Sequence, residues 1–167
     1  MNREFSAGGV VFKRLKGKIF WLVAKGTPGP DFPDNIWRLP KGWLDDKNEG
    51  RSPGPLASGL RKATQEEIKE AALKEVREEG GVLASILFKL GTEKYFLNFK
   101  GQRILKFVTF YLMEWERDLP EGFGWETQEV AWREFEDAKR KLSYKREKDV
   151  LSKANKRLNQ PVQGSLV

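Results

Sequence analysis

The chain has 167 residues, with 31 Lys and Arg against 24 Asp and Glu, and it contains no cysteine and no histidine. The two absent residue types exclude disulfides, thiolate and imidazole catalysis, and metal sites that depend on cysteine or histidine ligands. Acid–base and metal chemistry in this chain must therefore use carboxylates, lysines, tyrosines and hydroxyls, and carboxylates favour hard cations such as Mg²⁺ or Mn²⁺.

The composition indicates one globular domain. Apolar residues make up 39% and charged residues 33% of the chain. A chain of this length buries roughly 70% of its unfolded surface, so a core can form without covalent links. The sequence contains no run of about 18 apolar residues, so no membrane span is predicted. The first residues lack the apolar stretch of a signal peptide. We therefore expect a cytoplasmic protein.

Short strand patterns come first along the chain. Apolar runs bounded by turn residues predict strands at 5–12 and 19–24. Residues 36–42 alternate apolar and polar side chains and end in Pro-Lys-Gly, which predicts a third, short strand. Residues 43–63 are rich in Gly and Pro and are predicted to form a loop.

A helix is predicted at 65–79. Thr64 and Glu67 have the spacing of a capping box at its start. Gly80-Gly81 offers the left-handed residue that ends many helices. Its apolar residues recur every four positions and form one stripe, at Ile68, Ala72 and Val76.

The second half of the chain is predicted to be rich in strands up to a final helix. Strand patterns occur at 85–90, 94–99, 104–115 and 130–135, and Lys100-Gly101 is typical of a hairpin turn. Helical spacing predicts a basic helix at about 136–158, and residues 159–167 are predicted to form a flexible tail.

Three carboxylates share one face of the helix predicted at 65–79. Glu75, Glu78 and Glu79 stand at positions i, i+3 and i+4, where like charges repel by a few tenths of a kcal/mol per pair. Taken alone, this pattern fits a solvated acidic face or a cation site.

The segment from Ala71 to Val82 resembles the Nudix box, G-x5-E-x7-R-E-U-x-E-E-x-G-U, in which U is a bulky aliphatic residue. Leu39-Pro40-Lys41-Gly42 is similar to the strand and loop that precede this box, and residues 7–12 to the family's first strand. The residues that match the box are Glu75, Val76, Glu78, Glu79, Gly81 and Val82, with Glu66 at the spacing of its first Glu. The chain thus resembles the Nudix hydrolase superfamily over about residues 5–137, in the MutT-like form and nearest to diadenosine polyphosphate hydrolases.

Two features depart from the family pattern. Lys74 replaces the family's Arg, which keeps the charge but loses the planar fork. Residues 43–65 separate Gly42 from Glu66, where the family has five residues, so the motif contains a long insertion. The loop Glu of the motif is therefore left open between Glu66, Glu67 and Glu49.

The resemblance implies a Nudix fold of the α+β or α/β class, with a mixed β-sheet sandwiched between helices. We expect a single domain at 1–158 that contains the 43–63 insertion. The order of strands and helices predicted above agrees with this fold.

The resemblance also implies a magnesium site, with Mn²⁺ as the substitute. Glu78 and Glu79 are expected as metal ligands, Glu75 as a ligand or base, and the Gly42 carbonyl as a further ligand. In many relatives an acid in a late loop, six residues before a Trp or similar residue, acts as a further base or ligand. Glu126 stands six residues before Trp132, and Glu129 is the rival. The residues expected to maintain the motif's structure are Glu66, Lys74 and Gly81.

The resemblance implies hydrolysis of a nucleoside diphosphate linked to another moiety, most closely a dinucleoside polyphosphate of the diadenosine tetraphosphate type. Lys41 is expected at a phosphate, and Tyr95, Arg103 and Lys106 at a base and phosphates. Two alternatives stay open: an RNA 5′-end pyrophosphohydrolase, related to decapping enzymes, and a noncatalytic nucleotide- or RNA-binding module. Residues 133–157 hold ten basic and five acidic residues, which suits RNA or another polyanion and also suits a solvated helix face.

Overall fold

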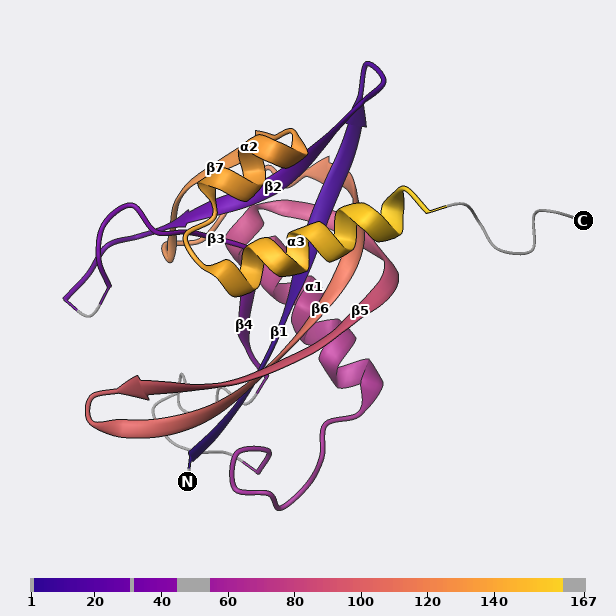
Figure 1. Cartoon of the computed structure of the whole chain (residues 1–167). Coiled ribbons are helices and arrows are strands. Elements are labelled where there is room, and N and C mark those ends of the chain that lie inside the picture. Colours follow the sequence, from indigo (N-terminus) through magenta and orange to yellow (C-terminus); the bar gives the residue numbers. More distant parts are fainter. Residues whose placement is uncertain (1, 31, 45–54, 161–167) are drawn as a thin grey trace, which may run out of the picture.

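The computed structural model describes residues 2–30, 32–44 and 55–160, which form a mixed sheet between helices (Figure 1). The strands are β1 (Asn2–Leu15), β2 (Lys18–Gly26), β3 (Trp37–Arg38), β4 (Lys41–Trp43), β5 (Val82–Phe99), β6 (Gln102–Asp118) and β7 (Thr127–Arg133). The helices are α1 (Gln65–Gly80), α2 (Phe135–Lys141) and α3 (Lys145–Leu158). The strand order is β3-β2-β1-β6-β5, with β4 paired to β1 and β7 to β2. Only β1 and β6 pair in parallel among these strands.

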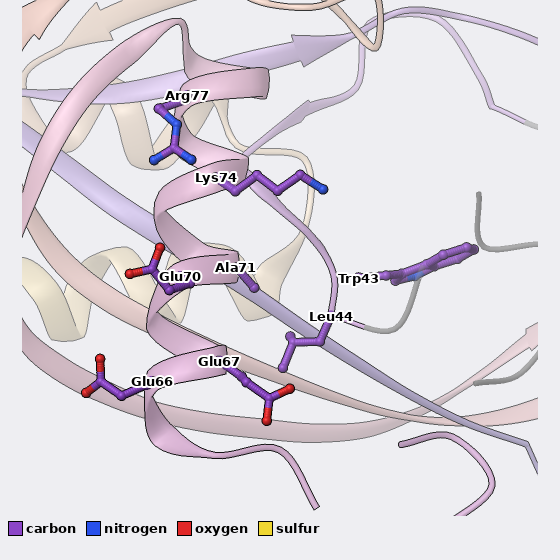
Figure 2. A pocket seen from close by; sticks show the side chains of 8 residues that line it. All are labelled: Trp43, Leu44, Glu66, Glu67, Glu70, Ala71, Lys74 and Arg77. Carbon is purple, nitrogen blue, oxygen red and sulfur yellow. The ribbon is translucent and has the colours of Figure 1, made fainter. Parts of the chain in front are cut away.

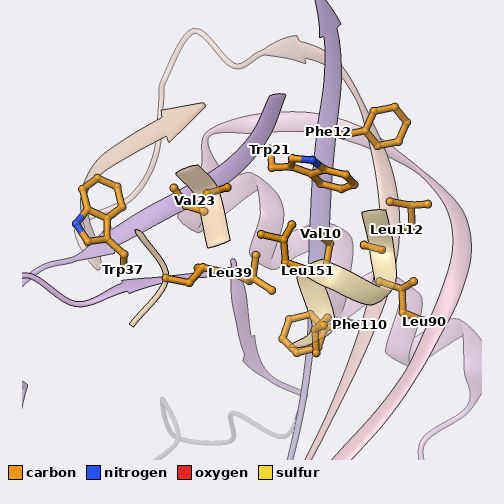
Figure 3. Close-up of a cluster of buried hydrophobic side chains, with 14 of the residues drawn as sticks. Val10, Phe12, Trp21, Val23, Trp37, Leu39, Leu90, Phe110, Leu112 and Leu151 are labelled. Carbon is orange, nitrogen blue, oxygen red and sulfur yellow. The ribbon is translucent and has the colours of Figure 1, made fainter. Parts of the chain in front are cut away.

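Alternating side chains on the central strands separate two hydrophobic cores, one on each face of the sheet. Val10 and Trp21 belong to the cluster that includes residues of α2 and α3, whereas Val11 and Leu22 belong to the cluster that includes residues of α1. Figure 3 shows the first cluster, in which Leu151 of α3 packs with residues of β1 and β2. The mixed sheet sandwiched between helices that the sequence predicts is therefore confirmed.

Both ends of α1 form as the sequence predicts. Thr64 Oγ1 accepts from the Glu67 backbone N–H at 3.1 Å, and Glu67 Oε1 accepts from the Thr64 N–H at 3.2 Å. Hydrogen bonds from Arg61 at 2.8 and 2.7 Å lower the pKa of Glu67 to about 2. At the other end, Gly81 has φ of 69°, and a methyl group there would press on the backbone of Phe123. The helix thus begins and ends at defined residues, which positions its carboxylates.

Two predicted boundaries in the second half are wrong. The expected gap between strands at 85–90 and 94–99 is absent, because irregular pairing with β6 between Lys89 and Gly91 bends β5 without ending it. The expected single helix at 136–158 is broken into α2 and α3. Ser143 lies at the break, where its N–H donates to the Trp37 carbonyl and its Oγ accepts from the Trp37 N–H, both at 2.9 Å.

The predicted hairpin and insertion have different outcomes. Lys100 and Gly101 connect β5 to β6 with φ of 49° and 76°, so the predicted hairpin turn is confirmed. Of the predicted 43–63 loop, Trp43 ends β4, and residues 45–54 lie outside the described residues, as do 161–167 of the tail. No helix in the part of the chain that the structure describes is long and apolar enough to cross a membrane.

Candidate active site

The last turns of α1 place Glu75, Glu78 and Glu79 at a pocket of about 270 Å³. The loop between β6 and β7 supplies the rest of its lining, through Gly124, Trp125 and Glu126. Glu75 and Glu79 are only 9% and 4% exposed, while Glu78 lies in contact with solvent. The pocket therefore combines buried and exposed carboxylates, and the structure brings together four of the predicted site residues.

A larger hollow of about 460 Å³ lies along the N-terminal part of α1. Figure 2 shows it between the helix and the segment formed by Trp43 and Leu44. The other residues that line it are Glu66, Glu67, Glu70, Ala71, Lys74 and Arg77. None of these charged side chains is buried. We place the candidate active site at the smaller pocket, because carboxylates buried beside one another are costly to ionise, and groups with such raised pKa values cluster at functional sites.

Both carboxylate oxygens of Glu79 are held by neighbouring donors. The Lys41 backbone N–H donates to Oε2 at 3.0 Å, and Arg38 Nη2 donates to Oε1 at 3.2 Å. Burial raises the pKa of Glu79 to about 7, against the lowering effect of Arg38 and the Lys41 N–H. Glu79 is thus fixed in orientation on α1 and tied to the segment that enters β4.

Glu75 packs directly against the backbone of Gly42. A methyl group at Gly42 would overlap the Glu75 carboxylate, which would then have to shift. Burial, followed by the nearby charges of Glu79 and Glu78, raises the pKa of Glu75 to about 8. Glu75 and Gly42, both predicted at the site, are therefore in close contact.

The chemistry of these donors fits a hard divalent cation. Burial, and then repulsion from neighbouring carboxylates, raises the pKa values of Glu75 and Glu79, and a bound cation would offset both effects. Within the described residues, no three acidic side chains converge closely enough to hold an ion by themselves. Mg²⁺ does not require such a cage, because it is commonly held by one or two carboxylates, waters and substrate phosphates.

We expect Mg²⁺ to raise the melting temperature strongly at about pH 8.5 and weakly at about pH 5. The folded pKa values of Glu75 and Glu79 lie above the ordinary 4.5, so their stabilising protonation is lost as pH rises through about 7 and 8. A cation replaces the lost protons only where the carboxylates are ionised. Thermal melts of the wild type and of the Glu75→Gln/Glu79→Gln variant test this. An equal Mg²⁺ effect in both proteins would contradict it.

Arg38 is a site residue that sequence reasoning missed. It projects from β3 and joins Glu79 to the late loop, because Nη2 also lies 3.3 Å from the Glu126 carbonyl. Its Nε is buried and has no hydrogen-bond partner among the described residues. A cation immediately before Leu-Pro-Lys-Gly was the only sequence signal available.

The late loop brings Glu126 to the pocket and leaves Glu129 outside its lining. Gly124 N–H donates to the Glu78 carbonyl at 2.6 Å, and Thr127 Oγ1 donates to the Glu79 carbonyl at 2.9 Å. Glu129 instead lies within β7, where its register partner is Lys25 of β2. Hydrogen bonds between the loop and α1 therefore hold Glu126 near the other carboxylates.

Lys41, predicted at a phosphate, is engaged in a buried ion pair. Its Nζ lies 2.7 Å from Glu147 Oε2, and the other oxygen of Glu147 accepts from the Leu39 N–H at 2.5 Å. Burial alone would lower the pKa of Lys41, but the Glu147 carboxylate outweighs it and raises the pKa. Glu147 of α3 therefore anchors the residues on both sides of Pro40, including the Lys41 N–H that holds Glu79.

Replacing Glu147 with alanine is expected to reduce the free energy of unfolding by about 3 kcal/mol, because it leaves the buried Lys41 ammonium uncompensated. The matched control is Asp149→Ala on the same helix, which removes an exposed pair with Lys145 at 3.0 Å. The control should change stability by about 0.5 kcal/mol or less. Chemical denaturation measures both, and equal losses would show that the buried pair does not anchor the fold.

The other predicted substrate residues divide into two groups. Tyr95 and Lys106 are register partners on β5 and β6, and Arg146 of α3 lies 3.8 Å from the Tyr95 ring centre. Burial, followed by the charge of Lys41, lowers the pKa of Lys106, so these cations are close. Arg103 lies three residues from Lys106 on the same strand and therefore on the opposite face, over the ring of Phe96 at 4.1 Å. The structure does not bring Arg103 to this group.

The residues predicted to support the motif lie along α1 and at its end. Glu66 is exposed and pairs with Lys69 at 3.8 Å, and Lys74 lies 4.0 Å from Glu78. Glu67 forms the helix cap, as described above, while Glu49 lies outside the described residues. Gly81 occupies the left-handed position that the motif glycine requires.

Comparison with known proteins agrees with the fold and identifies the family. The family model of the NUDIX domain matches residues 3–154, nearly the whole chain. The chain therefore belongs to the NUDIX domain family, as the motif predicted.

Individual relatives show similar domains at low identity. MutT4 of Mycobacterium tuberculosis (strain CDC 1551 / Oshkosh) is 29% identical over 142 residues, 84% of this chain and 50% of MutT4, so the chain spans about half of that relative's length. The Ap4A hydrolase of C. elegans has a TM-score of 0.60 at 24% identity, covering 93% of this chain and 97% of that chain. A NUDIX hydrolase from Nitrosomonas europaea has a TM-score of 0.64 at 15% identity, covering 98% and 99%. The two structures show the shared fold.

Proposed function

We propose that this protein is a Mg²⁺-dependent pyrophosphohydrolase that cleaves a dinucleoside polyphosphate of the diadenosine tetraphosphate type by attack of water on phosphorus. Mn²⁺ is the expected substitute cation. The observation that carries the proposal is the pair of buried carboxylates, Glu75 and Glu79, at a pocket that Glu78 and Glu126 also line. The similarity to an Ap4A hydrolase supports the choice of substrate.

Glu75, Glu78 and Glu79 would hold the cation together with waters and substrate phosphates, and the Gly42 carbonyl is the proposed further ligand. The cation supplies neutralisation of the phosphate charge and activation of the attacking water. Arg38 and the Lys41 N–H keep Glu79 in one orientation, so little reorganisation is needed when substrate binds. Glu126 accepts the proton of the attacking water, and Glu75 is the alternative base.

Residues beside the carboxylates suit the phosphate chain of such a substrate. Lys41 and Lys106 place positive charge next to the Tyr95 ring, and the Lys41 backbone connects this group to Glu79. Phosphates beyond the reacting one are attracted to these ammonium groups. Lys41 thus has two roles: it forms an ion pair with Glu147, and it contributes positive charge that attracts the substrate.

The same chemistry on RNA 5′ ends is the second candidate. Its support is the basic surface of α3, where Lys145, Lys153 and Lys156 are exposed. This function predicts a steep loss of activity with salt and a preference for triphosphorylated or capped RNA over free dinucleotides. A noncatalytic binding module is the third candidate, and it predicts nucleotide binding without turnover.

A substrate panel with Mg²⁺ separates these functions. Diadenosine tetraphosphate, a triphosphorylated RNA and a capped RNA are each incubated with the protein, and released nucleotides are quantified. Faster cleavage of the dinucleotide supports the proposal. Faster cleavage of RNA, or binding without any release, assigns the second or third function instead.

A further inference from the structure

Trp125 is a residue of the pocket lining that the hydrolytic chemistry does not use. It lies with the carboxylates in the pocket, yet 83% of its surface is exposed. Tryptophan is highly buried on average, so this exposure is unusual. Other indoles have partners: Trp115 and Trp132 pack edge to face, and Lys141 lies over Trp37. In the described ranges, no aromatic ring or cation is recorded over Trp125.

The backbone that carries Trp125 is fixed although its side chain is exposed. Thr27 Oγ1 donates to the Trp125 carbonyl at 2.7 Å, and the Thr27 N–H donates to the Glu126 carbonyl at 3.0 Å. On the other side, the Gly124 N–H bonds to the Glu78 carbonyl of α1. The indole therefore projects from an anchored loop, and ordering it against a ligand costs little conformational entropy.

The surroundings of the indole select the kind of ligand. Glu75, Glu78 and Glu79 occupy the neighbouring wall, so a bare anion would be repelled there without a cation, whereas a neutral aromatic ring is not. Tyr95, the aromatic residue on the other flank, has one face covered by Arg146. Trp125 thus offers an uncovered aromatic face directly beside the place where the phosphates are expected.

We propose that Trp125 stacks on a nucleobase of the substrate and is a specificity-determining residue. The proposal rests on the proposed function, because it assumes that the phosphates lie at the carboxylates. Stacking tolerates different bases, since each presents a similar flat face. Trp125 therefore favours nucleosides over substrates that lack an aromatic ring, without selecting one base.

Calorimetric titration with ADP and with inorganic pyrophosphate, both with Mg²⁺, tests the proposal without turnover. The two probes share a diphosphate and differ by the nucleoside. We expect Trp125→Ala to weaken ADP binding about tenfold and to leave pyrophosphate binding unchanged. Trp125→Phe, which keeps a flat ring, should restore most of the ADP affinity. The control is Phe88→Ala, an aromatic 42% exposed and outside the pocket lining, which should change neither affinity.

Unchanged ADP affinity in Trp125→Ala, or an equal loss for pyrophosphate, would overturn the stacking role. A wild type that binds ADP no more tightly than pyrophosphate would overturn it as well. The proposed function fails separately. If ADP binding requires Trp125 but the protein does not cleave diadenosine tetraphosphate, the stacking role is supported and the proposed substrate is wrong.

Discussion

Replacing Glu79 with glutamine is expected to slow hydrolysis of diadenosine tetraphosphate by about a thousandfold. The amide keeps the size of the side chain and can still accept the bond from the Lys41 N–H, which spans 3.0 Å in the wild type. It removes the negative charge that would hold the cation. The loss should therefore appear in kcat and should not be recovered by raising the substrate concentration.

The matched control for this variant is Glu70→Gln, at a position that precedes the pocket carboxylates on α1. Glu70 is exposed and lines the larger hollow along the helix, not the carboxylate pocket. The control should keep activity within about twofold, since surface substitutions usually change little. Equal losses in the two variants would show that helix charge in general, and not this pocket, supports the reaction.

Substituting Gly42 with alanine is expected to reduce activity by about a hundredfold. A displacement of about 1 Å in an active site can have an effect of this order. The added methyl group overlaps the Glu75 carboxylate and must shift it from its present position. The reaction rate should be measured across a range of Mg²⁺ concentrations. We expect the concentration needed for half-maximal rate to increase as well, since Glu75 is a proposed ligand.

Gly29→Ala is the control for the added methyl group. Gly29 is exposed, and a methyl group there would meet nothing within 4 Å. Its activity and Mg²⁺ requirement should match the wild type. If Gly42→Ala also behaves as the wild type, Glu75 does not need its present position and is not a metal ligand.

The parts of the fold that local interactions determine could be predicted from the sequence. The capping residues Thr64 and Glu67 and the left-handed Gly81 define α1 through contacts within a few residues. The three carboxylates share one face of α1 because of their helical spacing. Lys100 and Gly101 form the hairpin turn between β5 and β6 because both adopt positive φ values, which is a local property. The family motif adds the link between this helix and Gly42.

The parts that depend on contacts between distant segments could not be predicted. Arg38 meets Glu79 across 41 positions, and Glu147 meets Leu39 across 108. Ser143 breaks the last helix because it bonds to Trp37, which no local pattern reveals. Glu126, and not Glu129, lies at the pocket because the loop before it bonds to α1.

Hydrolysis of diadenosine tetraphosphate in ¹⁸O-labelled water tests the central claim most directly. Mass spectrometry of the nucleotide products follows the label with Mg²⁺, with EDTA, and in Glu79→Gln. We predict that nucleotides are released only with the divalent cation, that one ¹⁸O enters the phosphate of one product, and that Glu79→Gln slows this incorporation about a thousandfold. Release that persists in EDTA, or no release by the wild type with Mg²⁺, would contradict a cation-dependent hydrolytic site at Glu75, Glu78 and Glu79.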